Sequence, residues 1–307
     1  MEIDSFLLSV SAASDSEHTL RAYLRPLVRF EKFLQGKGLR IDQVKGYHIA
    51  EWINDLKQHP GRTRGEKLTP ATINSYLTPV SLYFDWRSAK LRSRAPNPVS
   101  LVKRPKVRNK DPKPVDDADL DRMSGGVTDL RDLALILLFL FSGLRLAEQA
   151  QLNRNSFRLK AHTLPDGSVE YYAYGTVMGK GKKEREFIVA PPAMLAIRDY
   201  LNQRRRSGDT LQPLFLSSRK TRLSCRAMEQ IISKWCRCLG IEHIHPHRLR
   251  HSYATRNIEA GMDLQTLAKL MGHDSITTTE RYIKLSRARI QREYYAAMEH
   301  IRQDAAA

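Results

Sequence analysis

The residues best suited to chemistry lie near the C-terminal end of the chain, within a window of 36 residues. The window contains His247, Arg250, His273 and Tyr282. A guanidinium keeps its charge and donates to two phosphate oxygens at once, whereas an imidazole can accept a proton near neutral pH. A phenol is a poor nucleophile unless a base or a positive field assists it. Together these side chains predict a site that transfers a phosphoryl group.

An upstream segment adds a second arginine. The dipeptide Ser142-Gly143 follows an apolar run, 133–141, and predicts a helix end that turns Arg145 away from the core. Glu148 comes three residues after this arginine. The segment therefore predicts a second guanidinium for the same site.

A basic segment between these two regions supplies candidate proton donors. It reads Gly-Lys-Gly-Lys-Lys-Glu-Arg over 179–185, inside alternating β-forming residues at 171–189. Glycines at a sharp turn between such residues predict a hairpin with Lys180 at its tip. A lysine on a hairpin tip can enter a cleft and give a proton to a leaving oxygen. Lys182 and Lys183 adjoin it, so chemistry alone does not choose among the three ammonium groups.

In their order along the chain, six candidates closely resemble the tyrosine recombinase (integrase) family, and in particular its Xer-like two-domain branch. They are Arg145, Lys180, His247, Arg250, His273 and Tyr282. The matching strings stand at 142–148, 179–185, 245–255 and 270–282. The segments 18–34 and 72–84 resemble the core-binding domain of that branch. The resemblance covers most of the chain, from about residue 5 to about residue 300.

The resemblance implies a mechanism, residue by residue. Tyr282 would attack a DNA phosphodiester, giving a 3′-phosphotyrosyl link and a free 5′-hydroxyl, while Arg145 and Arg250 hold the phosphate. His247 would accept the phenol proton, and Lys180 would protonate the 5′-oxygen. The expected function is site-specific DNA recombination, for integration, excision or resolution.

The resemblance also implies supporting roles and no cofactor. His273 would be a second hydrogen-bond partner for the phosphate or the phenol, and Glu148 would orient its neighbours. Because the phosphotyrosine retains the energy of the broken bond, a second strand's 5′-hydroxyl can reverse the step without a metal or ATP. Which hairpin lysine enters the site rests on motif alignment.

The charge of the chain independently indicates a polyanionic partner. Lys and Arg number 51 against 33 Asp and Glu, which gives a net charge of +18. The segment 86–110 has nine basic residues and no acidic one. We expect these and two hairpin lysines to bind DNA phosphates, although a basic run can also be merely a solvated surface. The expected DNA-binding residues are Arg87, Lys90, Arg92, Arg94, Lys103, Arg104, Lys106, Arg108, Lys110, Lys182 and Lys183.

The length of the chain and its linker-forming residues predict two domains of mostly α structure with a small β-sheet. A helical core-binding domain is expected at 1–104, a basic linker at 105–114 and an α+β catalytic domain at 115–307. The β-forming residues gather at about 155–190. An apolar stripe on the last predicted helix could pack on its own domain. The family resemblance implies instead that the stripe is an assembly contact in a tetramer on two DNA sites, formed by this protein alone or with a second recombinase. The stripe consists of Ile290, Tyr294, Met298 and Ile301.

Other site types fit the sequence less well. His247 and His251 are four residues apart as in zinc-binding helices, but arginines interleave them and no carboxylate accompanies them. Three cysteines imply no disulfide framework. The apolar run at 133–141 is too short to span a bilayer, and no secretory leader is evident, so a cytoplasmic location is expected.

Two alternative functions remain at this stage. A type IB topoisomerase-like enzyme would use the same chemistry to relax supercoils without exchanging strands. A DNA-binding protein without activity would keep the charge and lack a working site. Relaxation without a recombinant product would favour the first alternative, and DNA binding without a covalent adduct would favour the second.

Overall fold

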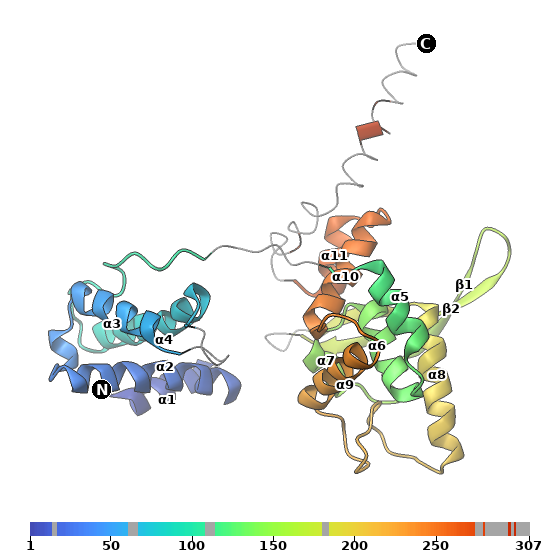
Figure 1. The fold of residues 1–307 in the computed structure, drawn as a ribbon, viewed down its shortest axis with the longest axis horizontal. Helices are drawn as coiled ribbons and strands as arrows, with labels where there is room; N and C mark the ends of the chain where they lie inside the picture. Colours follow the sequence, from blue (N-terminus) through green and yellow to red (C-terminus); the bar gives the residue numbers. More distant parts are fainter. Residues whose placement is uncertain are drawn as a thin grey trace. The chain divides into compact units, whose positions relative to one another are not determined.

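The computed structural model describes residues 1–13, 17–60, 67–107, 114–179 and 184–273, together with Thr279, Tyr294, Tyr295 and Met298. The chain divides into two compact units, an N-terminal unit of residues 1–109 and a C-terminal unit of residues 110–307. Figure 1 shows the helices and strands of the two units. The mostly helical fold with a small antiparallel sheet was predicted from the sequence and is confirmed. The finer boundaries at 104 and 115 stay a prediction.

The N-terminal unit is a helical bundle. It contains α1 (Ile3–Ala13), α2 (Glu17–Gly36), the 3₁₀ helix η1 (Ile41–Gln43), α3 (Gly46–Gln58) and α4 (Pro70–Lys90). The Thr69 hydroxyl caps α4 by accepting a hydrogen bond from the backbone N–H of Thr72. Phe30, Trp52 and Tyr83 are fully buried and link the helices through a common core. This bundle is what the helical spacing of its apolar residues predicts.

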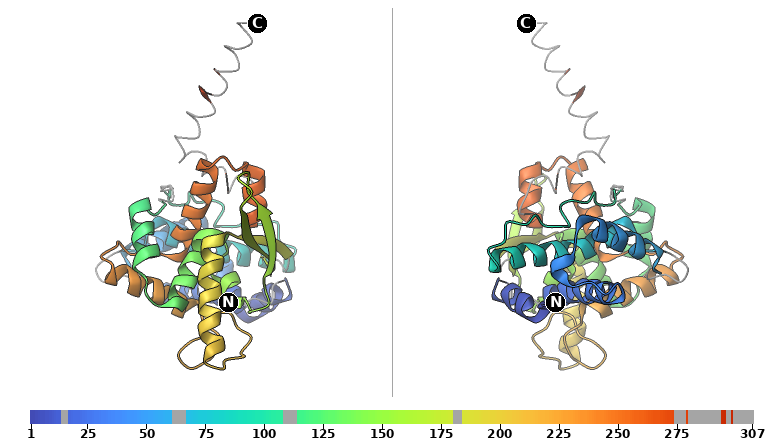
Figure 2. Two further views of the ribbon diagram at one scale, coloured as in Figure 1. Left: turned by 90° about the vertical axis from the view of Figure 1, so that its right-hand side faces the viewer. Right: turned by 90° about the vertical axis from the view of Figure 1, so that its left-hand side faces the viewer.

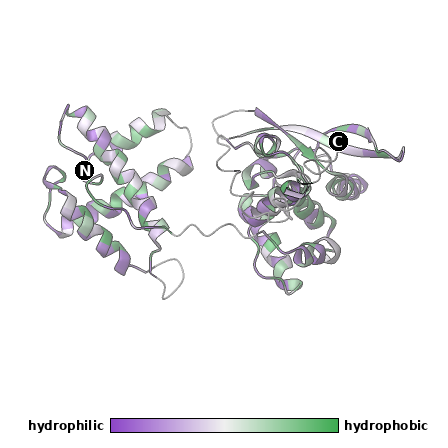
Figure 3. Ribbon diagram, turned by 90° about the horizontal axis from the view of Figure 1, so that it is seen from above, coloured by the Kyte–Doolittle hydropathy of each residue, from purple (hydrophilic) through white to green (hydrophobic). Residues whose placement is uncertain are grey.

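The C-terminal unit surrounds one very apolar helix. The apolar run becomes α6 (Leu130–Ser142), which is buried along most of its length. It packs against α8 (Pro191–Arg206) and α10 (Pro246–Glu259), and Figure 2 shows α8 (yellow) in the same unit. The other helices are α5 (Asp117–Gly126), α7 (Leu146–Gln151), α9 (Cys225–Cys238) and α11 (Leu264–Met271). Figure 3 shows hydrophilic and hydrophobic residues along the helices of each unit, as expected where a helix buries one side.

The sheet has three antiparallel strands in the order β1 (Arg158–Thr163), β2 (Val169–Met178) and β3 (Glu184–Val189). Its register pairs Val177 with Arg185 and Ala173 with Val189. The strands β2 and β3 flank residues 180–183, so the predicted hairpin is confirmed, whereas the loop itself lies outside the described residues. The sheet thus brings the start of β3 next to the end of β2.

The described part of the chain contains no helix that is both long enough and apolar enough to cross a membrane.

Candidate active site

The end of α6 sets the direction of the first arginine. Gly143 caps the helix in the left-handed conformation, with φ of 60°. A Cβ atom at this position would lie 2.5 Å from the ring of Tyr253 in α10, so only glycine fits. The chain then turns, and Arg145 becomes the N-cap of α7. The predicted helix end is therefore confirmed, and the reversal separates Arg145 from the apolar helix before it.

Glu148 holds Arg145 through both main chain and side chain. Its Oε2 accepts a 2.7 Å hydrogen bond from the backbone N–H of Arg145, and its Oε1 accepts one of 2.8 Å from Nη1. The carboxylate side chain is only 5% exposed, whereas the Arg145 side chain is 31% exposed. Because these residues are three apart at the start of a helix, the carboxylate also serves as a helix cap. One buried charge thus fixes the orientation of a more accessible one.

Arg185 is a third guanidinium of the site, and the sequence did not single it out. Arg185 in β3 donates from Nη2 to Glu148 Oε2 at 2.5 Å and from Nε to Oε1 at 3.3 Å. Burial by itself would raise the pKa of Glu148, but hydrogen bonds and charge from Arg185 and Arg145 outweigh it and hold the pKa below its usual value. Glu148 is therefore ionised at neutral pH.

The C-terminal end of α11 gathers all three arginines of the site. The carbonyl oxygens of Leu270, Met271 and Gly272 accept hydrogen bonds from Arg185, Arg250 and Arg145, respectively. The last carbonyls of a helix lack partners within it and carry partial negative charge, which favours cations. Three consecutive carbonyls thus place guanidiniums from three separate elements around one helix end.

Gly272 allows this close approach. It has φ of 63°, and a Cβ atom there would lie 2.4 Å from Arg185 Cδ and 3.4 Å from Arg145 Nη1. Any side chain would therefore displace the guanidiniums that surround the helix end.

Arg250 is the most enclosed arginine of the group. It is 4% exposed and donates to the carbonyls of Gly143 and Met271. Its Nη2 also lies 3.2 Å from His273 Nε2. Since a guanidinium can only donate, a hydrogen bond at this distance uses the ring nitrogen as acceptor and corresponds to the tautomer with its proton on Nδ1. That N–H then donates to Thr279 Oγ1 at 2.7 Å.

His247 lies in the first turn of α10, one turn before Arg250. Partial desolvation is the main cause that lowers its pKa, and the positive charges of Arg250, Arg145 and His245 lower it further. Although this histidine is still exposed, its ring is neutral at neutral pH. It lies nearly parallel to the ring of His251, with the ring centres 6.3 Å apart. The structure thus offers a proton acceptor within the field of the arginines.

The described site carries an excess of positive charge. The guanidiniums of Arg145, Arg185 and Arg250 gather at the end of α11, and the Glu148 carboxylate contacts the first two, which leaves a net charge of +2 for these four groups. Arg145 uses two of its five N–H groups in its contacts with Glu148 and Gly272, so three remain for a ligand. The arrangement suits an anion with several oxygens.

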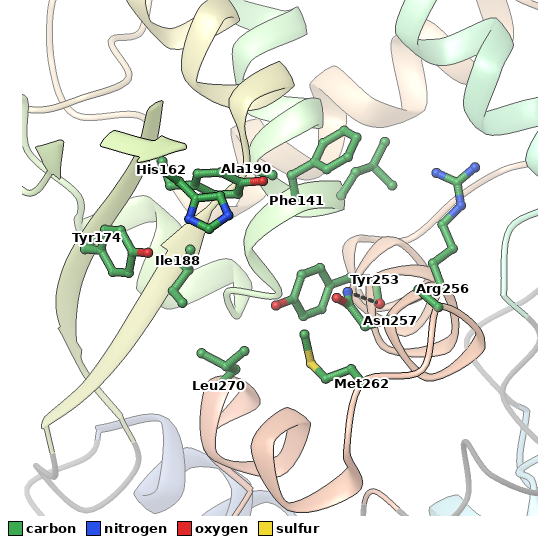
Figure 4. A pocket seen from close by; sticks show the side chains of 13 residues that line it. Phe141, His162, Tyr174, Ile188, Ala190, Tyr253, Arg256, Asn257, Met262 and Leu270 are labelled. Carbon is green, nitrogen blue, oxygen red and sulfur yellow. Dashed lines mark hydrogen bonds between the residues drawn. The ribbon is translucent and has the colours of Figure 1, made fainter. Parts of the chain in front are cut away.

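The described part of this unit contains several cavities, two of which differ in their lining. One of about 750 Å³ is lined by Arg145, Glu148, Thr176 and Gly179, next to the loop that contains Lys180. A second, of about 520 Å³, is mostly aromatic and aliphatic, and Figure 4 shows Phe141, Ile188, Tyr253 and Leu270 around it. Its lining does not suit a phosphate. We therefore place the candidate site at the cavity beside Arg145.

Several predicted residues lie outside the described parts of the chain. They are Lys180, Lys182, Lys183, Arg108, Lys110 and Tyr282. Among the residues that are described, no three histidine, cysteine, aspartate or glutamate side chains gather as metal ligands.

The basic residues predicted to bind DNA differ in their surroundings. Arg92 and Arg94 are exposed, whereas Lys90 forms a 2.5 Å ion pair with Glu2 and lies over the ring of Trp86. Arg104 donates to the Thr78 hydroxyl at 3.1 Å. Lys103 and Lys106 are also exposed, whereas Arg87 is half-buried. Not every positive charge of the run is therefore equally available to a phosphate.

Two segments of the chain match known families. Residues 119–289 match the phage integrase family, and residues 3–90 match the phage integrase N-terminal SAM-like domain. Curated relatives named tyrosine recombinase XerC are similar along most of the chain. The relative from Actinobacillus pleuropneumoniae serotype 7 is 31% identical over 289 residues, which cover 92% of this chain and 88% of the relative. The relative from Escherichia coli O127:H6 is 32% identical over 284 residues, covering 91% and 89%.

Solved structures share the fold. The XerH site-specific recombinase bound to a palindromic difH substrate aligns with a TM-score of 0.73 at 18% identity, over 95% of this chain and 83% of that chain. The Tn1549 transposon integrase in complex with transposon right end DNA aligns with a TM-score of 0.66 at 20% identity, over 95% and 99%.

Proposed function

The chain belongs to the phage integrase family of tyrosine recombinases, and on that premise we propose how its residues cleave and rejoin DNA. It is a site-specific recombinase, and enzymes of this family break and rejoin DNA without a metal cofactor. The observation that carries the proposal is the gathering of Arg145 and Arg250 at one helix end, with the His273 ring against Arg250.

In the proposed cleavage step, the Tyr282 oxygen attacks the phosphorus of a DNA phosphodiester. A bond forms between phosphorus and the phenol oxygen, and the bond from phosphorus to the 5′-oxygen breaks. His247 takes the phenol proton, and Lys180 gives a proton to the departing 5′-oxygen. The 5′-hydroxyl of a partner strand then attacks the phosphotyrosine, and the two proton transfers run in reverse.

The charges on the arginines support this assignment. The diester has one negative charge, and the attacking phenolate adds another, so the pentacoordinate transition state has two. The three guanidiniums and the Glu148 carboxylate together have a charge of +2. Preorganised positive groups stabilise such developing charge, since they need not reorient during the reaction. Arg145 and Arg250 are therefore proposed to hold the non-bridging oxygens.

His273 is proposed as a second hydrogen-bond partner of the phosphate or the phenol. Its Nε2 accepts from Arg250, and its Nδ1 donates to Thr279. It therefore also helps to hold the Arg250 guanidinium in place.

Duplex DNA is the proposed partner of both units. Exposed basic residues of the N-terminal unit, such as Arg92 and Arg94, would contact the phosphates of the site. We propose a tetramer on two DNA sites, with the stripe at 290–301 as an assembly contact. Within that segment, Tyr294 is 59% exposed, which leaves its ring available for such a contact. A recombinase of this kind would work in the cytoplasm, with the DNA it acts on.

Trapping of the covalent intermediate tests the proposal. The purified protein is mixed with nicked fragments of the source DNA, denatured and analysed on a gel, and the attached strands are sequenced. The expected adduct is lost in Tyr282→Phe and retained in Tyr171→Phe, a control that removes the hydroxyl of an exposed tyrosine on β2. An adduct in Tyr282→Phe would contradict the assigned nucleophile.

The same experiment separates the alternatives. DNA binding without an adduct in the wild-type protein would indicate a DNA-binding protein without activity. Relaxation of supercoiled DNA without exchange between two copies of the recovered site would indicate a topoisomerase-like enzyme. Light scattering of the complex between the protein and DNA that carries two sites would test the tetramer. A complex with two protein copies instead of four would contradict it.

A further inference from the structure

Arg185 connects three elements of the site. It belongs to β3, contacts the Glu148 carboxylate of α7 and donates to the Leu270 carbonyl at the end of α11. Its side chain is 9% exposed and that of Glu148 is 5% exposed, so the ion pair between them is largely shielded from water. Arg185 is the second residue of β3, and its side chain is largely buried although its neighbours Glu184 and Glu186 are exposed.

The contacts to Glu148 are shared evenly with Arg145. Each carboxylate oxygen accepts one hydrogen bond from each arginine: Oε1 from Arg145 Nη1 and Arg185 Nε, and Oε2 from the Arg145 backbone and Arg185 Nη2. A carboxylate with both oxygens held from two sides cannot rotate without breaking contacts. A planar guanidinium can grip both oxygens, whereas an ammonium group acts as a single point charge.

The second connection runs through the helix end. Arg185 holds the Leu270 carbonyl, and Arg145 donates to the Gly272 carbonyl at 2.5 Å. A displacement of this turn of α11 would therefore move the partner of Arg145 as well. Arg185 thus reaches Arg145 by two independent routes, one through a carboxylate and one through the backbone.

Arg185 also affects how much positive charge Arg145 offers to a ligand. If Glu148 had Arg145 as its single partner, the buried carboxylate would neutralise most of the charge that the phosphate needs. Because Arg185 shares the carboxylate, more of the positive charge of Arg145 remains for a ligand. Arg145 is also the more exposed of the two, at 31% against 9% for their side chains.

We propose that Arg185 is a positioning residue for strand cleavage, which fixes the Glu148 carboxylate and the end of α11 so that Arg145 points at the scissile phosphate. This inference rests on the proposed function. It assigns Arg185 no contact with DNA and no proton transfer. It therefore predicts a slower cleavage step without a matching loss of DNA affinity.

The test compares Arg185→Lys, Arg185→Met and the wild-type protein on the DNA site recovered by trapping. The rate of adduct formation is measured at saturating protein, and DNA affinity is measured separately by gel shift. We expect both variants to cleave about 10²-fold more slowly, because a small misplacement of a binding group near the reacting atoms has that effect. Arg185→Lys should not restore the cleavage rate, because an ammonium keeps the positive charge but cannot bind both carboxylate oxygens of Glu148 at once.

Arg204→Lys is the matched control. Arg204 is also a buried arginine, with a carboxylate partner in Asp209 and carbonyl partners in Leu211 and Pro213, but it lies at the end of α8. Its substitution should lower thermal stability and leave the cleavage rate of the folded protein unchanged. A rate loss in Arg204→Lys equal to that in Arg185→Lys would reduce the Arg185 effect to stability and overturn the inference.

A modified substrate separates Arg145 from the hairpin lysine. Replacing the bridging 5′-oxygen by sulfur gives a leaving group that needs no proton donor. The defect of Arg185→Met should persist on this substrate, because the phosphate is still held poorly. Full restoration would overturn the inference, since Arg185 would then act through the loop at 180–183.

Two further results of the cleavage assay would overturn the inference. Wild-type rates in Arg185→Lys would overturn the inference while the proposed function stands. An absence of adduct in the wild-type protein would overturn both.

Discussion

The backbone N–H of Val115 donates a 2.8 Å hydrogen bond to the hydroxyl of Ser252, inside the C-terminal unit. Two further contacts follow the same side of α10: Arg248 donates to the Pro114 carbonyl, and Arg256 pairs with Asp117. Residues 248, 252 and 256 are spaced by one helical turn each. The start of the C-terminal unit therefore lies along the helix that also presents His247 and Arg250.

Removal of this anchor should destabilise the unit. Ser252 is fully buried, and Ser252→Ala leaves the buried N–H of Val115 without its acceptor. We expect a loss of about 1–3 kcal/mol in the free energy of unfolding. Urea unfolding measures it, with Ser124→Ala as the control, since that exposed serine bonds within its own helix and should change stability by less than about 0.5 kcal/mol. Equal effects of the two substitutions would contradict the importance of the anchor.

Gly143→Ala should be more harmful than Gly167→Ala. Both glycines have positive φ, 60° and 83°, but only at Gly143 would a Cβ atom overlap a neighbour, the ring of Tyr253. The two substitutions share the cost of the left-handed conformation, and overpacking adds about 1–3 kcal/mol at Gly143. Thermal or urea unfolding of both variants gives the difference. If the two losses match, the contact with Tyr253 does not require glycine.

Cleavage should persist below the pH at which an ordinary histidine becomes charged. Desolvation and two neighbouring arginines lower the pKa of His247 from 6.5, so its proton-accepting form dominates to lower pH. The rate of adduct formation should therefore be flat across neutral pH and fall on acidification, with an apparent pKa below 6.5. His247→Gln should reduce the rate and remove this titration. A midpoint above 6.5, or the same midpoint in His247→Gln, would assign the titration to another group.

Two basic residues near the end of α4 should differ in their effect on DNA binding. Arg92 is exposed, whereas Lys90 is already paired with Glu2 at 2.5 Å. Arg92→Gln should reduce the slope of log affinity against log salt by about one, the value for one lost phosphate contact. Lys90→Gln should change it less, because its charge is partly satisfied within the protein. Titration of duplex DNA at several salt concentrations measures both slopes, and a larger change for Lys90→Gln would reverse the assignment.

The pattern of residues along the sequence was sufficient to predict much of the architecture. Ser142-Gly143 after an apolar run predicted the end of α6, because a left-handed glycine is a local property of the backbone. Alternating β-forming residues predicted the β2–β3 hairpin for a similar reason. The family resemblance placed Arg145, Glu148, Arg250 and His273 in one site, and the structure brings these four together. Their catalytic roles stay a prediction.

Tertiary structure alone decided how those residues are held. The sequence shows Arg185 as one more basic residue after three lysines, and strand alternation does not reveal that its guanidinium is buried against Glu148. Nor does it show that the consecutive carbonyls of Leu270, Met271 and Gly272 at the end of α11 accept from Arg185, Arg250 and Arg145. These partners are far apart along the chain, and their distances depend on how helices and sheet pack. The residue types determined which chemistry is possible, and packing determined which charges are buried, shared or left available to DNA.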